Sequence, residues 1–597
     1  MVEECLLGLP AALQTVSVCP PSEIFAALPE FVKERRTKCA QTALKTPISM
    51  LTASDWLIFF RTGNRTSYEE RYFGRRRRLT DLVCGALSGD AEVYLDAVVD
   101  TIWAICEESA WQMPAHNQYN RDTPQLTWPD TERPVVDLFA AETGALLTCA
   151  CAALQSILPE AVVDRVRREV WTRILTPYQT EHFWWMGHGG ESVNNWTPWC
   201  TQNVLLCAFA LPCCEKVRRT VIAKAAYSLD CFLKDYGTDG CCNEGAQYYG
   251  HAGLCLYACL ELLCEAAPGA FNGLWQEEKI RNIAANIHYL HIAGPYYVNF
   301  ADCSPKAGRR GAREYCFARR TQNPAMARFA AQDWRESFTE PIAQNDIARI
   351  NLWYQLLETR VAAEMAGCGA PRLQDTPGDI FYPSVGVFIA RHGDWVLAAK
   401  AGGNADSHNH NDTGSITLYR GEKPFLIDLG VETYTQKTFS PQRYEIWTMQ
   451  SQWHNLPTFD GVQQQDGAEF CAHGVQTQFL PETAQISMEL SAAWPKQAQL
   501  DSLMRTVSLT ADGLTLTDTA YGGYHTAFLS LMLCEKPQVD GDRVTVGSLG
   551  TVLLEGASGA VETDVLSIQD ARLRIAWPDT LYRLRIPFSH SLTVRIF

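Results

Sequence analysis

The spacing of apolar residues changes along this chain, and that change constrains the fold more than any other feature. From about residue 20 to 370, apolar residues recur every three or four positions, as in Ala145–Leu158 and Val217–Leu233, which is the spacing of amphipathic helices. After about residue 378 the period falls to two, as in Leu514–Asp518, which is typical of strands with one buried face. The sequence therefore predicts a helical half followed by a strand half.

Each half has further features that narrow its architecture. The helical half has no exact repeat, and its helices are separated by Gly- and Pro-bearing loops, which favours a large bundle, solenoid or toroid. In the strand half, Asp512-Gly513 predicts a hairpin within a sandwich of antiparallel sheets. The segment Gly367–Gly378 has Pro371, Pro377 and several glycines, so we expect a linker there and two domains, 1–370 and 371–597.

Length and composition exclude several classes of protein. A chain of 597 residues exceeds what one hydrophobic core usually supports. A net charge of −16 argues against a nucleic-acid partner. No apolar run approaches membrane-spanning length and the N-terminus has no positively charged signal, so we expect a cytoplasmic protein with no membrane partner. Many of the 22 cysteines lie inside apolar helical patterns, which predicts reduced, buried thiols.

A first polar cluster spans Gly187–Trp199. Its glycines allow the backbone to approach a ligand closely, and it brings together His188, Asn195, Trp196 and Trp199. Indole faces and amide donors are what a sugar-binding subsite needs. The alternative is an ordinary capped loop that contains core tryptophans.

A second cluster, Asp239–His251, leads into a helix predicted over Leu254–Leu263. It places Tyr248 and Tyr249 near the start of that helix, where the helix dipole is expected to lower the pKa of a phenol. Such a phenol is a candidate for proton transfer. The alternative is that the two tyrosines only pack.

A third cluster begins at Asn404–Asp412 and continues to Asp428 and His454. On an extended chain His408 and His410 point to one side, and a hairpin returns Asp428 along the neighbouring strand. Two imidazoles and one carboxylate suit Zn²⁺. If every histidine bound metal, none would remain for proton transfer, so we predict His410, Asp428 and His454 as ligands, with His408 facing the cleft. The alternative is a hydrogen-bonded polar network without metal.

A weaker feature is the segment Asn299–Asp302 and the basic residues after it. Such a basic loop is expected to supply a positive field for an acidic sugar, although an ordinary solvated charge run has the same composition. Its members are Lys306, Arg309, Arg310, Arg313, Arg319 and Arg320.

These clusters, in this order on a helical half and then a strand half, resemble the heparinase II/III-like family of polysaccharide lyases. The resemblance covers most of the chain and is strongest in Asn194-Asn195-Trp196, in Glu244–Tyr248 and from His408 to Asp428. It implies an N-terminal (α/α) helical toroid with a C-terminal antiparallel β-sandwich, and an active cleft between them. It also implies a structural zinc, for which His410, Asp428 and His454 match by position.

The resemblance also implies roles for individual residues. Asn195 would bind the uronate carboxylate, Tyr248 would act as base or acid, and His408 would be its partner in a β-elimination. The partner molecule would be an acidic oligosaccharide or polysaccharide, and a dimer is one of the oligomeric states left open. Some relatives have histidine at the position of Asn195, which leaves the role of Asn195 open. Tyr249 is adjacent to Tyr248, so the choice between these two tyrosines is also open. The residues predicted to contact substrate are His188, Trp199, Tyr249, Arg313 and Arg443.

Other classes of function remain open at this point. A glycoside hydrolase on a helical toroid would use two carboxylates, and Glu191, Asp239 and Glu244 are candidates. A zinc hydrolase would use the predicted metal ligands to activate water. A sugar-binding protein that retains the lyase shape is a non-enzymatic alternative. The particular uronate, its sulfation, and endo or exo action cannot be predicted from these residues.

Overall fold

A computed structural model of the chain describes residues 1–89, 91–120, 123–187, 190–342, 347–406 and 408–597. The chain divides into two compact units. The first consists of Met1–Tyr236, Gly250–Ala284 and Arg309–Asp375, and the second of Gly237–Tyr249, Ala285–Gly308 and Thr376–Phe597. The last passage from the first unit to the second falls within the predicted linker, Gly367–Gly378. The units nevertheless differ from the predicted domains, because two segments of the helical half pack with the strands.

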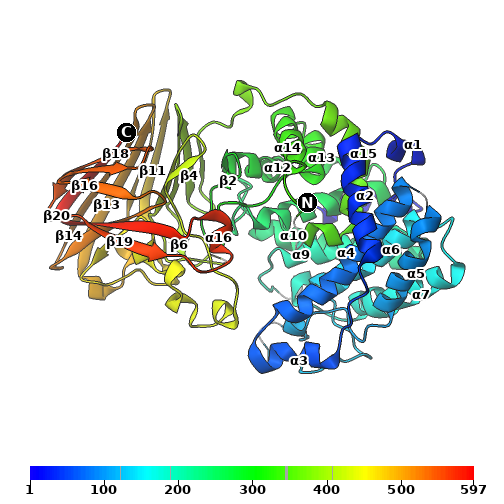
Figure 1. The fold of residues 1–597 in the computed structure, drawn as a ribbon. Helices are drawn as coiled ribbons and strands as arrows, with labels where there is room; N and C mark the ends of the chain where they lie inside the picture. Colours follow the sequence, from blue (N-terminus) through cyan, green and yellow to red (C-terminus); the bar gives the residue numbers. More distant parts are fainter. Residues whose placement is uncertain (90, 121–122, 188–189, 343–346, 407) are drawn as a thin grey trace. The chain divides into compact units, whose positions relative to one another are not determined.

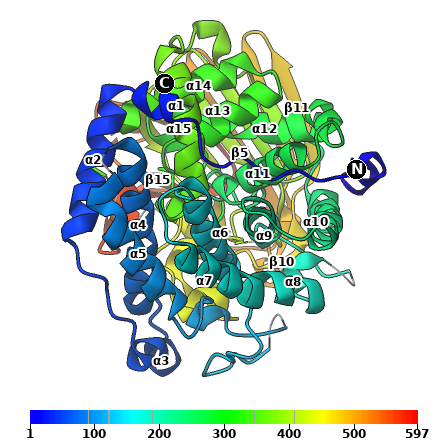
Figure 2. The same cartoon turned by 90° about the vertical axis from the view of Figure 1, so that its right-hand side faces the viewer.

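The first unit consists of helices (Figures 1 and 2). Three of them, α6, α9 and α11, are rich in Ala, Cys and Leu and are buried on nearly every side, as expected for helices without a polar face. Helix α6 packs against α4, α7 and α9, and α9 packs against α10 and α11. The helices are α1 (Ser22–Ala26), α2 (Glu30–Lys45), α3 (Ala53–Thr62), α4 (Thr66–Ser88), α5 (Ala91–Cys106), α6 (Leu138–Ala153), α7 (Glu160–Val170), α8 (Thr176–Thr180), α9 (Trp196–Phe209), α10 (Glu215–Asp235), α11 (Gly253–Ala266), α12 (Glu278–Leu290), α13 (Ala312–Arg320), α14 (Pro324–Ser337) and α15 (Leu352–Gly367). The residues of α12 from Ala285 on belong to the second unit.

An apolar stripe holds the outer helix α7, and a side-chain cap fixes the start of the buried helix α6. In α7, Val162, Val163, Val166 and Val170 are buried and the charged residues between them face outward, so the helix is held by one face. Asp137 caps α6 by accepting a hydrogen bond from the backbone N–H of Ala140, which satisfies one of the amides that a helix start leaves unpaired. The predicted helical half is therefore confirmed.

The second unit is built on antiparallel sheets. A five-stranded sheet has the order β3-β4-β5-β7-β8, and an eleven-stranded sheet contains the path β11-β12-β13-β14-β20-β18-β17-β16 with β9, β15 and β19 beside it. The smaller sheet uses β3 (Ile380–Tyr382), β4 (Val387–His392), β5 (Trp395–Lys400), β7 (Ile416–Arg420) and β8 (Lys423–Leu426). The larger uses β9 (Pro457–Phe459), β11 (His473–Leu480), β12 (Thr483–Glu489), β13 (Leu500–Thr510), β14 (Gly513–Gly522), β15 (Ala527–Leu533), β16 (Pro537–Asp540), β17 (Arg543–Val546), β18 (Gly550–Ala557), β19 (Glu562–Ser567) and β20 (Thr580–Ile596).

The inner faces of the two sheets share one hydrophobic core. It contains Phe388 and Leu418 from the smaller sheet and Val507 and Leu516 from the larger, which is the packing of a β-sandwich. The predicted hairpin is present, with β13 and β14 paired in register up to Thr510 and Gly513. Gly513 has φ +138° and a Cβ there would meet the carbonyl oxygen of Ile596, so only glycine fits. The predicted strand half is therefore confirmed.

Smaller elements complete the second unit and carry the residues of interest. β1 (His291–Ala293) pairs with β2 (Tyr296–Tyr297), and β6 (Gly403–Asn404) pairs with β10 (Gly467–Cys471). Residues 237–249 and 285–308 bring Tyr248 and Asp302 into this unit. Within the described part of the chain, no helix has the length and apolar character required to cross a bilayer.

Candidate active site

A buried carboxylate, Asp302, lies at the centre of a polar group in the second unit. Its side chain is fully buried, and each of its oxygens has two partners. Oδ1 lies 2.6 Å from Nη2 of Arg443 and 3.0 Å from Nε2 of His410. Oδ2 lies 2.9 Å from Nδ1 of His408 and accepts the hydroxyl of Tyr434 at 3.2 Å. The carboxylate therefore links two predicted site histidines, the predicted Arg443 and one tyrosine.

The Arg443 charge and the imidazoles decide the protonation of Asp302. Burial alone would raise the pKa of this carboxyl, but the hydrogen bonds from His408 and His410 and the charge of Arg443 hold the pKa well below its usual range. Asp302 is therefore an ionised acceptor.

Tyr248 joins this group through a second phenol. Its hydroxyl oxygen lies 2.6 Å from that of Tyr434, and its ring stacks on His408 with centroids 4.7 Å apart and an interplanar angle of 27°. The guanidinium of Arg572 lies 4.4 Å from the centre of the Tyr434 ring, within cation–π range. Tyr248, His408 and Tyr434 are only partly buried, so a ligand can reach them.

The expected lowering of the Tyr248 pKa is wrong. Burial raises the pKa of Tyr248 well above its usual value, and the neighbouring Tyr434 and Asp302 raise it further. Burial and the neighbouring groups outweigh the expected effect of the helix dipole on this pKa, and apolar periodicity reveals neither of them. At neutral pH this phenol carries its proton.

His408 occupies a backbone conformation that few non-glycine residues adopt. Its φ is +58°, and such a conformation is kept where the surroundings impose it, often at functional sites. The Nε2 atom lies 3.8 Å from Oε2 of Glu244, which is longer than a hydrogen bond. The side chain thus directs Nδ1 to Asp302 and places Nε2 near the carboxylate of Glu244.

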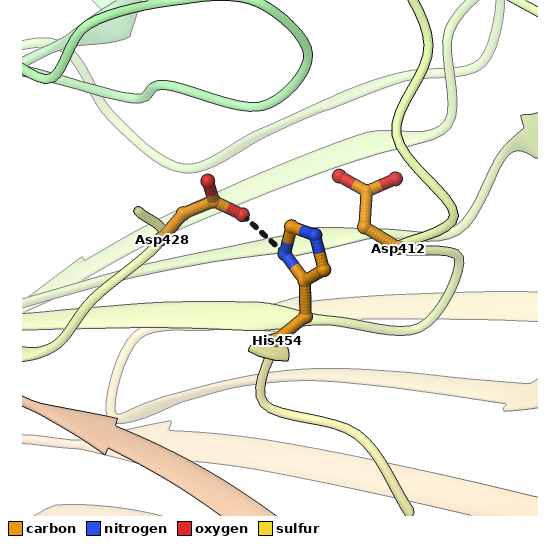
Figure 3. A group of neighbouring side chains, drawn as sticks. All are labelled: Asp412, Asp428 and His454. Atoms are coloured by element: carbon orange, nitrogen blue, oxygen red, sulfur yellow. Dashed lines mark hydrogen bonds and ion pairs between the residues drawn. The ribbon is translucent and has the colours of Figure 1, made fainter. Parts of the chain in front are cut away.

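A second cluster in this unit has the geometry of a metal site. Ligand atoms of Asp412, Asp428 and His454 lie within 4.8 Å of one another, and all three side chains are buried. In Figure 3 the His454 ring lies between the two carboxylates, with Nδ1 2.8 Å from Oδ2 of Asp428. Among the described residues, Nε2 of His454 and Oδ2 of Asp412 have no hydrogen-bond partner. Lys400 Nζ contacts the other Asp412 oxygen at 2.6 Å.

The predicted ligand His410 stands beside this cluster rather than within it. Its Nε2 contacts Asp302, and its Nδ1 is buried without a partner in the described part of the chain. The rings of His410 and His454 have centroids 5.6 Å apart. Buried, unpaired imidazole nitrogens and carboxylate oxygens are the donors that Zn²⁺ prefers. The residues therefore fit a zinc ion, with Asp412 as a ligand candidate in addition to the predicted ones.

The first unit carries other predicted site residues, and Trp199 and Arg313 among them contact interior groups. Trp199 is buried and stacks on His251, with ring centroids 4.2 Å apart. Arg313 donates to the carbonyl oxygen of Gly250 at 2.9 Å and lies over the ring of Tyr354. These contacts favour structural roles for Trp199 and Arg313. Asn195 precedes the first residue of α9 and is buried.

The remaining predicted substrate contacts have different outcomes. Tyr249 belongs to the second unit and is fully buried, which favours packing and supports the choice of Tyr248. Arg443 lies with Asp302, as described above. His188 lies outside the described residues. The basic loop is largely neutralised: Arg309 pairs with Asp333, Glu336 and Glu340, Arg319 with Glu364, and Arg320 with Glu261.

Comparison with known families identifies the strand-rich part of the chain. Residues 374–570 match the family described as heparinase II/III-like, C-terminal. This segment is therefore similar to heparinase II/III-like C-terminal domains. The matched segment contains His408, His410, Asp428 and Tyr434, whereas Tyr248 and Asp302 precede it in the sequence.

Solved structures of polysaccharide lyases share the fold of the whole chain. A crystal structure of heparinase III aligns with 100% of this chain and 88% of its own, with a TM-score of 0.61 and 14% identity. A heparan sulfate lyase mutant from Pedobacter heparinus aligns with 98% of this chain and 84% of its own, with a TM-score of 0.57 and 12% identity. A Streptomyces coelicolor chondroitin AC lyase in complex with chondroitin sulphate aligns with 100% of this chain and 82% of its own, with a TM-score of 0.53 and 11% identity. No curated protein matches the sequence significantly.

These similarities confirm the resemblance to heparinase II/III-like proteins and the predicted fold class. That class is an N-terminal (α/α) helical toroid followed by a C-terminal antiparallel β-sandwich. At 14% identity or less, the structural similarity carries the fold and not the activity.

Proposed function

We propose that this protein is a polysaccharide lyase that cleaves uronate-containing glycans by β-elimination. The observation that supports the proposal most is the stacking of the Tyr248 phenol on the His408 imidazole, with Asp302 and Tyr434 holding the two rings. A phenol and an imidazole side by side supply the acid and base that the reaction needs. The shared fold with heparinase III and chondroitin AC lyase supports the same class of reaction.

The proposed reaction uses both rings. One group removes the proton on C5 of the uronate, the C4–O4 bond breaks, the electron pair forms a C4=C5 double bond, and the departing O4 receives a proton. His408 Nε2 is the proposed base and the Tyr248 hydroxyl the proposed acid. Asn195 is the proposed partner of the uronate carboxylate, which must be neutralised before C5 becomes acidic enough.

We also propose that the buried cluster binds Zn²⁺ through Asp412, Asp428 and His454, with His410 as a further ligand. When bound, the ion would have a structural role, because it would join the segment that carries His408 to the segments that carry Asp428 and His454. His408 itself stays outside the ligand set, where it is available for proton transfer.

The hydrolase alternative has less support from the geometry. Asp239 accepts hydrogen bonds from the backbone N–H of Ser384 at 2.9 Å and from its hydroxyl at 2.7 Å, which favours a structural role in the turn between β3 and β4. Glu191 lies 2.6 Å from Nε2 of His182. The remaining candidate, Glu244, is buried and lies 3.8 Å from Nε2 of His408, the proposed base of the elimination.

The test is an ultraviolet assay of the purified protein with heparan sulfate, chondroitin, hyaluronan, alginate and pectic oligomers. The proposal predicts an absorbing 4,5-unsaturated uronate from at least one of these, and its loss in Tyr248→Phe. Tyr521→Phe is the matched control, because Tyr521 is an exposed tyrosine of the same unit. New reducing ends without ultraviolet absorbance would show hydrolysis instead.

A further inference from the structure

We propose that Arg572 and Phe439 form a substrate subsite beside Tyr434, in which Arg572 binds a carboxylate or sulfate group of the glycan and Phe439 stacks on a sugar ring. The subsite rests on the proposed lyase function, because it holds an acidic sugar next to Tyr248 and His408. All of these residues belong to the second unit.

The guanidinium of Arg572 carries a charge that the described part of the chain does not neutralise. Its Nη2 atom donates to the side-chain oxygen of Gln247 at 3.3 Å and to the carbonyl oxygen of Asp302 at 3.2 Å, and both acceptors are neutral. Arg443, the other guanidinium of the group, lies 2.6 Å from the Asp302 carboxylate, whereas none of the carboxylates in the described ranges forms an ion pair with Arg572. A guanidinium keeps its proton in proteins, so this charge is available to an anionic ligand.

The acidic residue closest to Arg572 in sequence, Asp570, is used to build the turn. Its Oδ1 accepts the backbone N–H groups of Arg572 and Leu573, each at 3.0 Å. Its Oδ2 accepts the backbone N–H of Thr433 at 3.1 Å, which ties the turn to the segment that carries Tyr434. Leu573 begins the short helix α16 (Leu573–Ala576; Figure 1) and is buried in a small apolar cluster. The backbone of Arg572 is therefore fixed before a ligand arrives, which lowers the entropy lost on binding.

The position of the Arg572 charge places an anion close to the reactive pair. The guanidinium lies over the Tyr434 ring, 4.4 Å from its centre, and the Tyr434 hydroxyl is 2.6 Å from that of Tyr248. Stacking occupies the face of a guanidinium and not the N–H donors at its edge. Carboxylate and sulfate are oxyanions that such donors bind through charge-assisted hydrogen bonds.

Phe439 supplies an apolar surface at the same group. Its ring centroid lies 5.1 Å from that of Tyr434 and 6.3 Å from that of His408, yet 56% of the residue is exposed. A sugar ring has an apolar face of C–H groups that packs on an aromatic ring. Phe439 therefore suits the ring of a bound sugar, and Arg572 suits its charged substituent.

The primary test measures binding by calorimetry in the full-length Tyr248→Phe protein, in which the proposed reaction is blocked. The ligands are heparan sulfate, chondroitin, hyaluronan, alginate and pectic oligomers. Arg572→Gln is expected to raise the Kd by about 10- to 100-fold at low salt and to remove much of its salt dependence, whereas Arg572→Lys should keep that dependence. Phe439→Ala should raise the Kd by about 2- to 10-fold, by the same factor at low and high salt, because its contact is apolar.

Two matched controls and two chemical derivatives sharpen this test. Arg574 is an exposed arginine of the same turn and Phe597 an exposed phenylalanine of the same unit, so Arg574→Gln and Phe597→Ala should leave the Kd and its salt dependence unchanged. The effect of Arg572→Gln should disappear with carboxyl-reduced oligomers if Arg572 binds a carboxylate, and with desulfated oligomers if it binds a sulfate. An effect that persists with both derivatives would show a structural role and overturn the proposal.

One outcome does not depend on whether any variant at the subsite folds. Binding of none of the acidic oligomers, or equally tight binding of an oligomer that has lost its carboxylate and sulfate groups, would overturn the subsite.

Kinetics separate the failure of the subsite from the failure of the proposed function. With the glycan found in the ultraviolet assay, Arg572→Gln is expected to raise KM by about 10-fold or more while kcat changes by less than about 3-fold. An active lyase whose Arg572→Gln variant keeps its KM and salt dependence would reject the subsite and retain the function. A protein that binds acidic oligomers through Arg572 and forms no unsaturated product would reject the function and retain the subsite.

Discussion

The hydroxyl oxygens of Tyr248 and Tyr434 lie 2.6 Å apart although the residues are separated by 186 positions in the sequence. Tyr248 comes from the segment 237–249, which lies between helices in sequence and packs with the second unit. Tyr434 comes from the irregular stretch between β8 and β9. A short bond between two phenols couples their hydrogens, so a change at either one is expected to alter the other.

Tyr248→Phe should separate the acid role from the base role. Removal of the hydroxyl is expected to lower kcat by about 10²- to 10⁴-fold with natural glycans, because O4 then leaves without a proton donor. A uronide with a nitrophenyl leaving group needs no such proton, so its cleavage should survive in Tyr248→Phe and fail in His408→Gln. Steady-state rates with both substrates measure this. Equal loss with both leaving groups would argue against Tyr248 as the acid.

Arg443→Gln should lower the stability of the protein as well as its activity. Arg443 pairs with the fully buried Asp302 and also donates to the carbonyl oxygens of Asn409 and Thr438. Loss of one partner of a buried pair costs about 3 kcal/mol, because an uncompensated charge remains. Thermal unfolding should therefore shift downward by several degrees. Arg595→Gln is the control, since its pair with Glu555 is exposed and should contribute less than about 1 kcal/mol.

Removal of the proposed zinc ion should lower the thermal stability of the second unit. If Asp412, Asp428 and His454 hold Zn²⁺, the purified protein should contain zinc, and prolonged treatment with a chelator should lower the unfolding temperature. Asp412→Ala should reduce the zinc content measured by elemental analysis. Asp406→Ala is the comparison, because Asp406 also faces Lys400 and lies outside the ligand group. Full zinc content in Asp412→Ala would remove Asp412 from the ligand set.

The pH dependence of stability should include a contribution from Glu142 in the first unit. Burial raises the pKa of Glu142 from its ordinary 4.5 to about 7, although the Asn351 amide and the Arg313 charge oppose the shift. The folded protein then binds a proton that the unfolded chain has released, so stability falls as pH rises from about 4.5 to about 7. The size of this fall is about 3 kcal/mol.

Glu142→Gln removes this titration and checks its sign. In urea unfolding between pH 5 and 8, the free energy of unfolding of the variant should fall less steeply with pH than that of the wild type. The variant should be more stable than the wild type at pH 8. Glu142 accepts from Asn351 at 2.9 Å, and an amide oxygen can keep that bond. A variant with the same slope as the wild type would show that other groups dominate.

The sequence predicted the features that depend on local spacing. Apolar period alone distinguished the helices from the strands, because a buried helix face and a buried strand face repeat at different intervals. The hairpin at Asp512-Gly513 was predictable for the same reason, since one turn and its two strands are adjacent in the chain.

The centre of the candidate site depends on contacts that local spacing does not encode. Asp302 meets His408, Tyr434 and Arg443 at separations of 106, 132 and 141 positions. In the sequence, Asp302 is distinguished only as the last residue of a short segment, Asn299–Asp302, that precedes several basic residues. Tyr434 and Arg572 lie in irregular segments and carry no motif signal at all. Burial, which raises the pKa of Tyr248 against the expected direction, likewise appears only in the folded chain.

The most direct test of the account is the mass of the products released from an acidic glycan. Elimination predicts that each new non-reducing end absorbs in the ultraviolet and is lighter by one water than the corresponding product of hydrolysis. It also predicts that the variants Tyr248→Phe and His408→Gln release neither the unsaturated nor the hydrolysed product from natural glycans. Products that carry the full mass of added water, or undiminished cleavage by both variants, would contradict it.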